Sequence, residues 1–183
     1  MKKTFIRYFT IADFEEEEIW LREMNKKGWK LISMTIPCFY HFESCETEDV
    51  IYRLDFLDRE APEDYMQMLS DFGWEYIDTC AGWLYFRRSA DTAASEEEGE
   101  LFSDDESRVD LVGKIVRTRM LPIALLFFCS VLPNFLRTVN GEFTGHFGYA
   151  AQILFCALFV IYVFLIVHCG IKLKKIRDRF RNE

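Results

Sequence analysis

The sequence lacks the motifs by which most enzymes and cofactor-binding proteins are identified. The richest run of glycine is the segment GEFTGHFG, with Gly141, Gly145 and Gly148. A phosphate-binding loop needs a strand before it and a lysine after it, and neither is present here. We therefore expect no cofactor.

A complete set of metal ligands is also missing. Cys38, His41 and Cys45 have a spacing that superficially resembles a zinc site, but such a site usually needs a fourth ligand. The segment alternates like a strand, so Cys38 and His41 would point to opposite faces. For the same reason Cys38 and His41 cannot act together as a nucleophile and its base, and no third group is placed to orient them. We expect no metal ligand and no catalytic residue, and predict that the protein is not an enzyme.

Two long stretches, 120–136 and 147–171, contain no charged side chain. As helices they would be about 25 Å and about 37 Å long, enough to cross a bilayer if the longer one tilts. Two such stretches joined by a short loop leave nothing polar to face water, which argues against a buried hairpin of a soluble protein. The sequence predicts transmembrane helices at about 120–137 and 147–171.

Basic residues flank these stretches unevenly. Lys114, Arg117 and Arg119 precede the first, whereas the loop between them offers only Arg137. This imbalance places both termini in the cytosol by the positive-inside rule. Six further basic residues follow the second stretch and are expected to contact lipid headgroups; they are Lys172, Lys174, Lys175, Arg177, Arg179 and Arg181.

The N-terminus has no apolar run typical of a signal peptide, because Arg7 and Asp13 interrupt it. Of the six cysteines, three lie in the first 90 residues and three within the apolar stretches. In a reducing cytosol we expect no structural disulfide.

Charge divides the chain into three blocks. The net charge is −7 over residues 1–90, −8 over 91–110 and +7 over 111–183. The middle block has almost nothing to bury, which is typical of a disordered spacer. We predict a cytosolic domain at 1–90, an acidic linker at 91–113 and a membrane segment with a basic tail at 114–183. The negative first block disfavours nucleic-acid binding.

The first block repeats at an offset of 45 residues: Gly28-Trp29 matches Gly73-Trp74. Each pair is expected to end a helix. Asp13 and Glu16 predict a capping box at the start of the first helix, and Pro62 opens the second. The acidic run Glu15–Glu18 is expected to be solvated at the positive end of the helix dipole.

Six strands are expected, at 4–10, 30–35, 38–43, 50–57, 75–79 and 83–88. Two βαβ-type units predict the α+β class: a ferredoxin-like antiparallel sheet with two helices on one face. If the strands break fully at Pro37 and Gly82, the sheet gains extra hairpin strands.

Four segments carry a resemblance: GWKL from Gly28, YRLDF at Tyr52–Phe56, GWEYI from Gly73 and GWLYFRR from Gly82. Together they resemble the bacterial membrane family catalogued as domain of unknown function 2812, over about residues 2–90, and the paired apolar stretches fit it too. Members are often encoded beside PadR-like transcriptional repressors. The resemblance implies a bacterial cytoplasmic membrane location, but no activity and no site residues.

Arg53 and Asp55 share one face of an expected strand. They form either a cross-strand salt bridge or, together with Arg87, a ligand or partner contact. The sheet face left open by the helices predicts a protein partner or a homo-oligomer. The resulting hypothesis is a membrane-anchored cytosolic regulatory or adaptor domain. Alternatives are a subunit of a small transporter or membrane complex and, third, a membrane enzyme acting on an apolar substrate.

Overall fold

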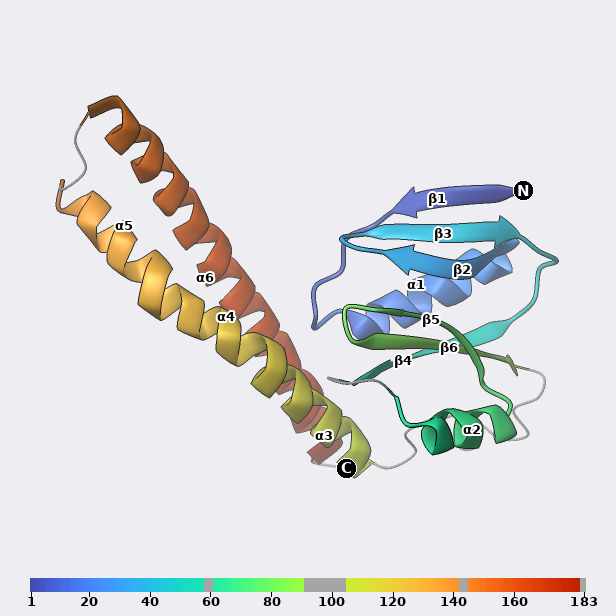
Figure 1. Cartoon of the computed structure of the whole chain (residues 1–183). Coiled ribbons are helices and arrows are strands. Elements are labelled where there is room, and N and C mark those ends of the chain that lie inside the picture. Colours follow the sequence, from blue (N-terminus) through green and yellow to red (C-terminus); the bar gives the residue numbers. More distant parts are fainter. Residues whose placement is uncertain (58–60, 91–104, 142–144, 182–183) are drawn as a thin grey trace. The chain divides into compact units, whose positions relative to one another are not determined.

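The computed structural model describes residues 1–57, 61–90, 105–141 and 145–181 (Figure 1). The chain divides into two compact units, Met1–Leu111 and Val112–Glu183, which are described separately below. The mixed α+β class is confirmed for the first unit, and the second is helical.

The first unit contains two halves with the same order of elements, strand–helix–strand–strand. The first half comprises β1 (Lys2–Ile6), α1 (Phe14–Lys26), β2 (Trp29–Thr35) and β3 (Phe39–Ser44). The second comprises β4 (Val50–Phe56), α2 (Glu63–Asp71), β5 (Glu75–Cys80) and β6 (Trp83–Ser89). Each half forms its own antiparallel sheet with its last strand in the middle, in the orders β1-β3-β2 and β4-β6-β5.

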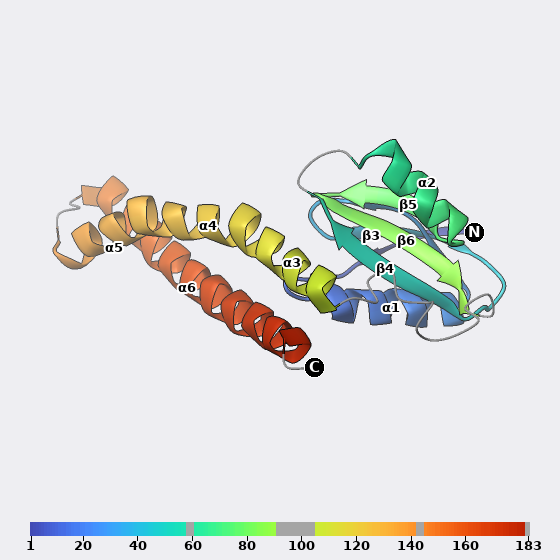
Figure 2. The ribbon, with the colours of Figure 1, turned by 90° about the horizontal axis from the view of Figure 1, so that it is seen from below.

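The expectation of one sheet with both helices on one face is wrong. There are two three-stranded sheets, and a hydrogen bond from Met34 N to Asp78 Oδ2, at 2.8 Å, joins their edge strands β2 and β5. On β6, Phe86 packs in a cluster with Leu69 of α2, whereas Tyr85 reaches Glu17 of α1. Neighbouring strand residues face opposite ways, so the helices cover opposite faces of the second sheet (Figure 2). Because β6 carries large side chains on both of its faces, each face has to be covered by a helix.

The helix ends agree with the predicted Gly-Trp stops. Gly28 and Gly73 adopt positive φ angles of 81° and 80°, the left-handed conformation that glycine accepts most easily. The strands also break as considered above, with hairpin turns between β2 and β3 and between β5 and β6. The predicted capping box is wrong: Asp13 bonds backwards, accepting hydrogen bonds from Thr10 N at 2.7 Å and Thr10 Oγ1 at 2.6 Å.

The acidic run at the start of α1 is only half solvated. Glu16 is exposed, but Glu17 and Glu18 retain only 6% and 7% exposure. Glu18 accepts hydrogen bonds from Leu54 N, at 2.8 Å, and from Arg53, at 3.0 Å. The first of these gives a partner to a backbone N–H group of the edge strand β4. The prediction of a wholly solvated run is therefore wrong, because the second half of the run faces the sheets.

Glu17 joins the two halves of the first unit. Tyr40 of β3 and Tyr85 of β6 each donate a hydrogen bond to Glu17 Oε1, both at 2.8 Å. The two tyrosines occupy equivalent positions of the 45-residue repeat. Burial raises the pKa of Glu17, and the two tyrosine hydrogen bonds oppose that rise.

The second unit is built from two long helical segments. The first runs through α3 (Asp105–Ile115), which belongs to this unit from Val112 on, α4 (Leu121–Leu126) and α5 (Leu132–Val139). Two π-helical turns join these helices. The second segment is α6 (Gly145–Arg181). Val109–Val139 and Gly148–Arg179 are each long and apolar enough to cross a membrane.

Each π-helical turn stands just before a Leu-Pro pair. The turns span Val116–Met120 and Phe127–Val131, and the prolines are Pro122 and Pro133. Proline lacks an N–H group, and its ring would clash with the carbonyl four residues earlier. A wider turn accommodates both effects without ending the helix.

The segment 91–113, expected to be an acidic linker, is described only from residue 105. The rest lies outside the described residues. From Asp105 the chain is helical, and Leu111, Val112 and Ile115 are buried. Burial of these apolar side chains stabilises helix where the net charge alone predicts disorder.

Aromatic side chains hold the two long helices together. Phe135 stacks on Phe159 with ring centroids 4.1 Å apart, and Phe127 contacts both Phe159 and Tyr162. α6 continues without a break into the basic tail, where Leu173 is buried. The hairpin therefore depends on ring packing within the apolar stretch and on aliphatic packing near the basic end.

The role of Glu17 predicts different effects for two substitutions. Glu17→Gln keeps an acceptor for both tyrosines and should change the free energy of unfolding by less than about 1 kcal/mol at neutral pH. Glu17→Ala removes this acceptor from two buried hydroxyl groups and should lower the free energy of unfolding by about 2–4 kcal/mol. All four tryptophans lie in the first unit, so tryptophan fluorescence of the full chain in detergent follows its unfolding by denaturant. Equal stability of the two variants would contradict this role.

The raised pKa of Glu17 adds a pH dependence. Above the ordinary value of 4.5, the native state binds this proton while the unfolded state has lost it. The contribution of Glu17 to stability therefore falls as the pH rises from about 4.5 through the pKa of the folded state. Glu17→Gln should lack this fall when wild type and variant are compared over the same pH series.

The two left-handed glycines provide a matched pair. Alanine at either position should cost about 1–2 kcal/mol for the left-handed backbone. At Gly28 its Cβ would also lie 3.2 Å from the backbone oxygen of Cys45, whereas at Gly73 the nearest atom is Arg88 Nε at 3.7 Å. Gly28→Ala should therefore destabilise the unit more than Gly73→Ala in the same fluorescence assay. The reverse order would contradict the close approach of Gly28 to Cys45.

A polar cavity with a buried arginine as the candidate functional site

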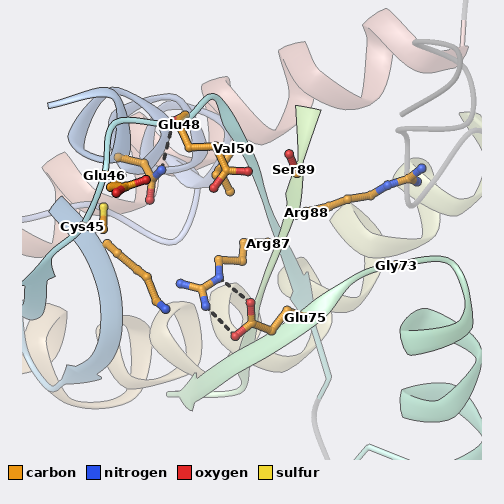
Figure 3. A pocket seen from close by; sticks show the side chains of 11 residues that line it. Cys45, Glu46, Glu48, Val50, Gly73, Glu75, Arg87, Arg88 and Ser89 are labelled. Atoms are coloured by element: carbon orange, nitrogen blue, oxygen red, sulfur yellow. Dashed lines mark hydrogen bonds and ion pairs between the residues drawn. The ribbon is translucent and has the colours of Figure 1, made fainter. Parts of the chain in front are cut away.

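A cavity of about 350 Å³ lies where the two halves of the first unit meet (Figure 3). It is lined by the end of α1, the start of β2, the connection 45–50 between the halves, the start of β5 and the end of β6. Its charged lining residues balance in sign: Lys30, Arg87, Arg88, Glu46, Glu48 and Glu75. The cavity is therefore polar without a strong net charge.

Arg87 is the most buried charged group in this lining, with 8% of its surface exposed. It lies directly opposite Glu75 in the ladder between β5 and β6, and its Nε donates to Glu75 Oε2 at 2.7 Å. Its Nη2 donates to the other carboxylate oxygen, so two parallel bonds fix the guanidinium. Its Nη1 is buried and has no hydrogen-bond partner among the described residues.

The connection 45–50 is held against α1 by side chains. The Tyr52 hydroxyl donates to Asn25 Oδ1 at 3.1 Å, and Asn25 Nδ2 donates to the backbone oxygen of Glu48 at 3.0 Å. Arg22 pairs with Asp49 at 2.6 Å, and its hydrogen bonds lower the pKa of Asp49 to about 2. These contacts fix the wall of the cavity opposite β6.

Cys45 is the one thiol that lines the cavity among the described residues. Burial raises the pKa of Cys45, although Lys30 and Arg87 act in the opposite direction. A thiol with a raised pKa is a poor nucleophile at neutral pH. The cavity is therefore better suited to binding than to thiolate chemistry.

The three residues singled out from the sequence do not form one site. Arg53 pairs with Glu18 of α1, and buried Asp55 accepts a hydrogen bond from the Tyr65 hydroxyl of α2 at 2.6 Å. Arg87 pairs in register with Tyr52 rather than with Arg53, and of the three it alone lines the cavity. Arg53 and Asp55 thus fasten β4 to the two helices.

The alternation of β6 contains a signal for Arg87. Trp83, Tyr85 and Arg87 follow one another at every second position, and Trp83 and Tyr85 are buried aromatic residues of the core. A charged side chain that continues a buried stripe is unusual and indicates a partner or a ligand. Lys30 and Glu48 carry no comparable local signal, because long-range folding brings them to the cavity.

The Cys38–His41 segment forms no cluster. His41 contacts Thr4 through Nδ1 at 2.9 Å and Thr35 through Nε2 at 3.0 Å, across three neighbouring strands. Among the described residues no group of three or more His, Cys, Asp and Glu side chains is placed to hold a metal ion.

Residues 13–125 match the family described as "Protein of unknown function (DUF2812)", and this match covers more than half of the 183 residues. The chain belongs to the DUF2812 family. The family match spans the elements from α1 to β6, which include every described strand except β1, and continues into the first apolar stretch. No curated protein and no solved structure matches this DUF2812 chain.

Proposed function

We propose that this DUF2812 protein is a membrane-anchored, non-enzymatic regulatory protein whose first unit binds a small polar ligand in the cavity around Arg87. The observation that carries the proposal is the guanidinium of Arg87, which lines a polar cavity, is fixed by Glu75 and has a buried Nη1 without a hydrogen-bond partner among the described residues. The volume of about 350 Å³ falls in the range of small-molecule sites.

The position of the cavity supports a regulatory role. Its wall includes the connection 45–50 between two halves that share one order of elements, which fits a duplicated, ferredoxin-like ancestor. A ligand that contacts both halves would favour one arrangement of them over others. A protein partner on the outer face of β1-β3-β2, or self-association there, would then respond to the ligand.

Membrane anchoring is supported by the two long apolar helices. We place both ends of the chain in the cytosol of a bacterial cell, with the hairpin end of α5 and α6 outside, because the basic residues flank the other ends. In the tail, Lys174, Lys175, Arg177 and Arg179 are exposed and can reach headgroup phosphates.

The ligand proposal is tested with the full chain in a non-ionic detergent. A panel of neutral, cationic and acidic small molecules is screened for a rise in the unfolding temperature, followed by tryptophan fluorescence. Ser89→Phe, which fills the cavity, should abolish any rise, whereas Ser70→Phe on the exposed face of α2 should not. A rise that survives Ser89→Phe would place the ligand elsewhere. Co-purification with other membrane subunits and no ligand effect would favour a transporter or complex subunit instead.

The topology is tested by labelling intact cells with a membrane-impermeant maleimide. Asn140→Cys, at the end of α5, should be labelled. The wild-type chain is the matched control and should stay unlabelled until the cells are permeabilised, because its cysteines lie in the first unit or in the apolar helices. Labelling of wild-type protein on intact cells would contradict the proposed orientation.

A further inference from the structure

We infer that the ligand of this cavity carries one carboxylate or phosphate group, which Arg87 Nη1 binds with Lys30 as the second cation. This inference rests on the proposed function and adds the chemical class of the ligand. No step of it requires a covalent change.

The first argument is the state of Arg87. Nε and Nη2 are held by Glu75, so the guanidinium has a fixed plane and its remaining nitrogen has a fixed direction. Nη1 is buried without a hydrogen-bond partner among the described residues, and a buried donor left unpaired is costly. Arg87 lies close enough to the Tyr52 hydroxyl to lower its pKa against the larger, raising effect of burial, but no hydrogen bond joins that hydroxyl to Nη1.

The second argument is the position of Lys30. Among the described residues its Nζ has one ion pair, a long one with Glu43 at 3.8 Å, and its side chain is 36% exposed. Lys30 and Arg87 both line the cavity, and both lower the pKa of Cys45 against the larger, raising effect of burial. The two cations therefore act on the same part of the cavity, where an anion would meet both.

The third argument limits the charge of the ligand. Glu46, Glu48 and Glu75 also line the cavity, so its formal net charge is zero with Arg88 and about −1 without it. One acidic group is compensated by the available donors, but a polyanion would meet the glutamates. Hydroxyl or ammonium groups elsewhere on the ligand could donate to Glu46 or Glu48.

The inference is tested by equilibrium dialysis of the full chain in dodecyl maltoside against labelled inorganic phosphate and, separately, labelled succinate. Ionic strength is kept constant with chloride. We expect saturable binding of at least one anion, and the stronger of the two identifies the acidic group. Arg87→Gln should weaken this binding by about tenfold or more, because a charge-assisted hydrogen bond is lost. Lys30→Gln should weaken it less.

Arg53→Gln is the matched control. Arg53 is also an ion-paired arginine of the first unit, held by Glu18, but it does not line the cavity or hold its wall. It should leave anion binding unchanged. Tryptophan fluorescence shows whether each variant is folded; if Arg87→Gln is not, the partly exposed Lys30→Gln decides the test.

Two results would overturn the inference. One is the absence of saturable binding of either anion to the wild-type chain, as expected if only water meets Nη1. The other is anion binding that a folded Arg87→Gln variant, or Lys30→Gln in its place, does not weaken. A third result would separate the two proposals: a neutral ligand whose binding is lost in Ser89→Phe but unchanged in Arg87→Gln. It would uphold the proposed function and refute the inference that the ligand is acidic.

Discussion

The first unit depends on one buried hydrogen-bond acceptor, the Glu17 side chain, at the junction of two sheets. In the part of the chain that the structure describes, no backbone ladder joins β1-β3-β2 to β4-β6-β5, so side chains must do so. Tyr40 and Tyr85, at equivalent repeat positions on the two central strands, converge on the same oxygen of Glu17. The repeat position that corresponds to Glu17 in the second half is Pro62, which precedes α2 and offers no acceptor side chain. Only α1 can therefore serve both sheets, and α2 is left to cover the outer face of the second sheet.

The same helix connects this junction with the candidate site. Glu17 and Asn25 are separated by about two turns, or about 12 Å along α1. At the first position α1 holds the sheets together; at the second it holds the connection 45–50 and the Tyr52 hydroxyl. The cavity forms beyond the point where the tyrosines close the interface, and Arg87 lies two residues after Tyr85 on the same face of β6. A ligand at Arg87 would thus contact the strand and the helix that also bear the junction.

Local features were predictable from the sequence, whereas the sheet face that each helix covers was not. The Gly-Trp stops depend on backbone conformation within a few residues, and the strand expected at 50–57 is observed at Val50–Phe56. The strand expected at 4–10 instead ends at Ile6, and the guanidinium of Arg7 lies over the rings of Phe9 and Trp20. Glu17 was readable in hindsight, because it stands three residues after Phe14 and four before Leu21 on the apolar stripe. The contacts between residues 20 to 70 positions apart, such as Asn25 with Glu48 and Glu17 with Tyr85, were not predictable from the sequence.

The basic tail shows how internal packing limits what a surface segment can do. Leu173, Ile176 and Phe180 have the spacing of an amphipathic helix, which could lie in a lipid interface. Leu173 and Ile176 are buried, however, and Leu173 lines a small cavity of about 230 Å³ with Val112 and Val116. These side chains are therefore not available to enter lipid. In the proposed topology, attraction of the tail to the membrane surface depends on its exposed lysines and arginines alone. Such attraction extends over a Debye length of about 8–10 Å and weakens with salt. The tail therefore adjusts the position of the cytosolic end of α6, while the apolar stretches of the two helices hold them in the bilayer.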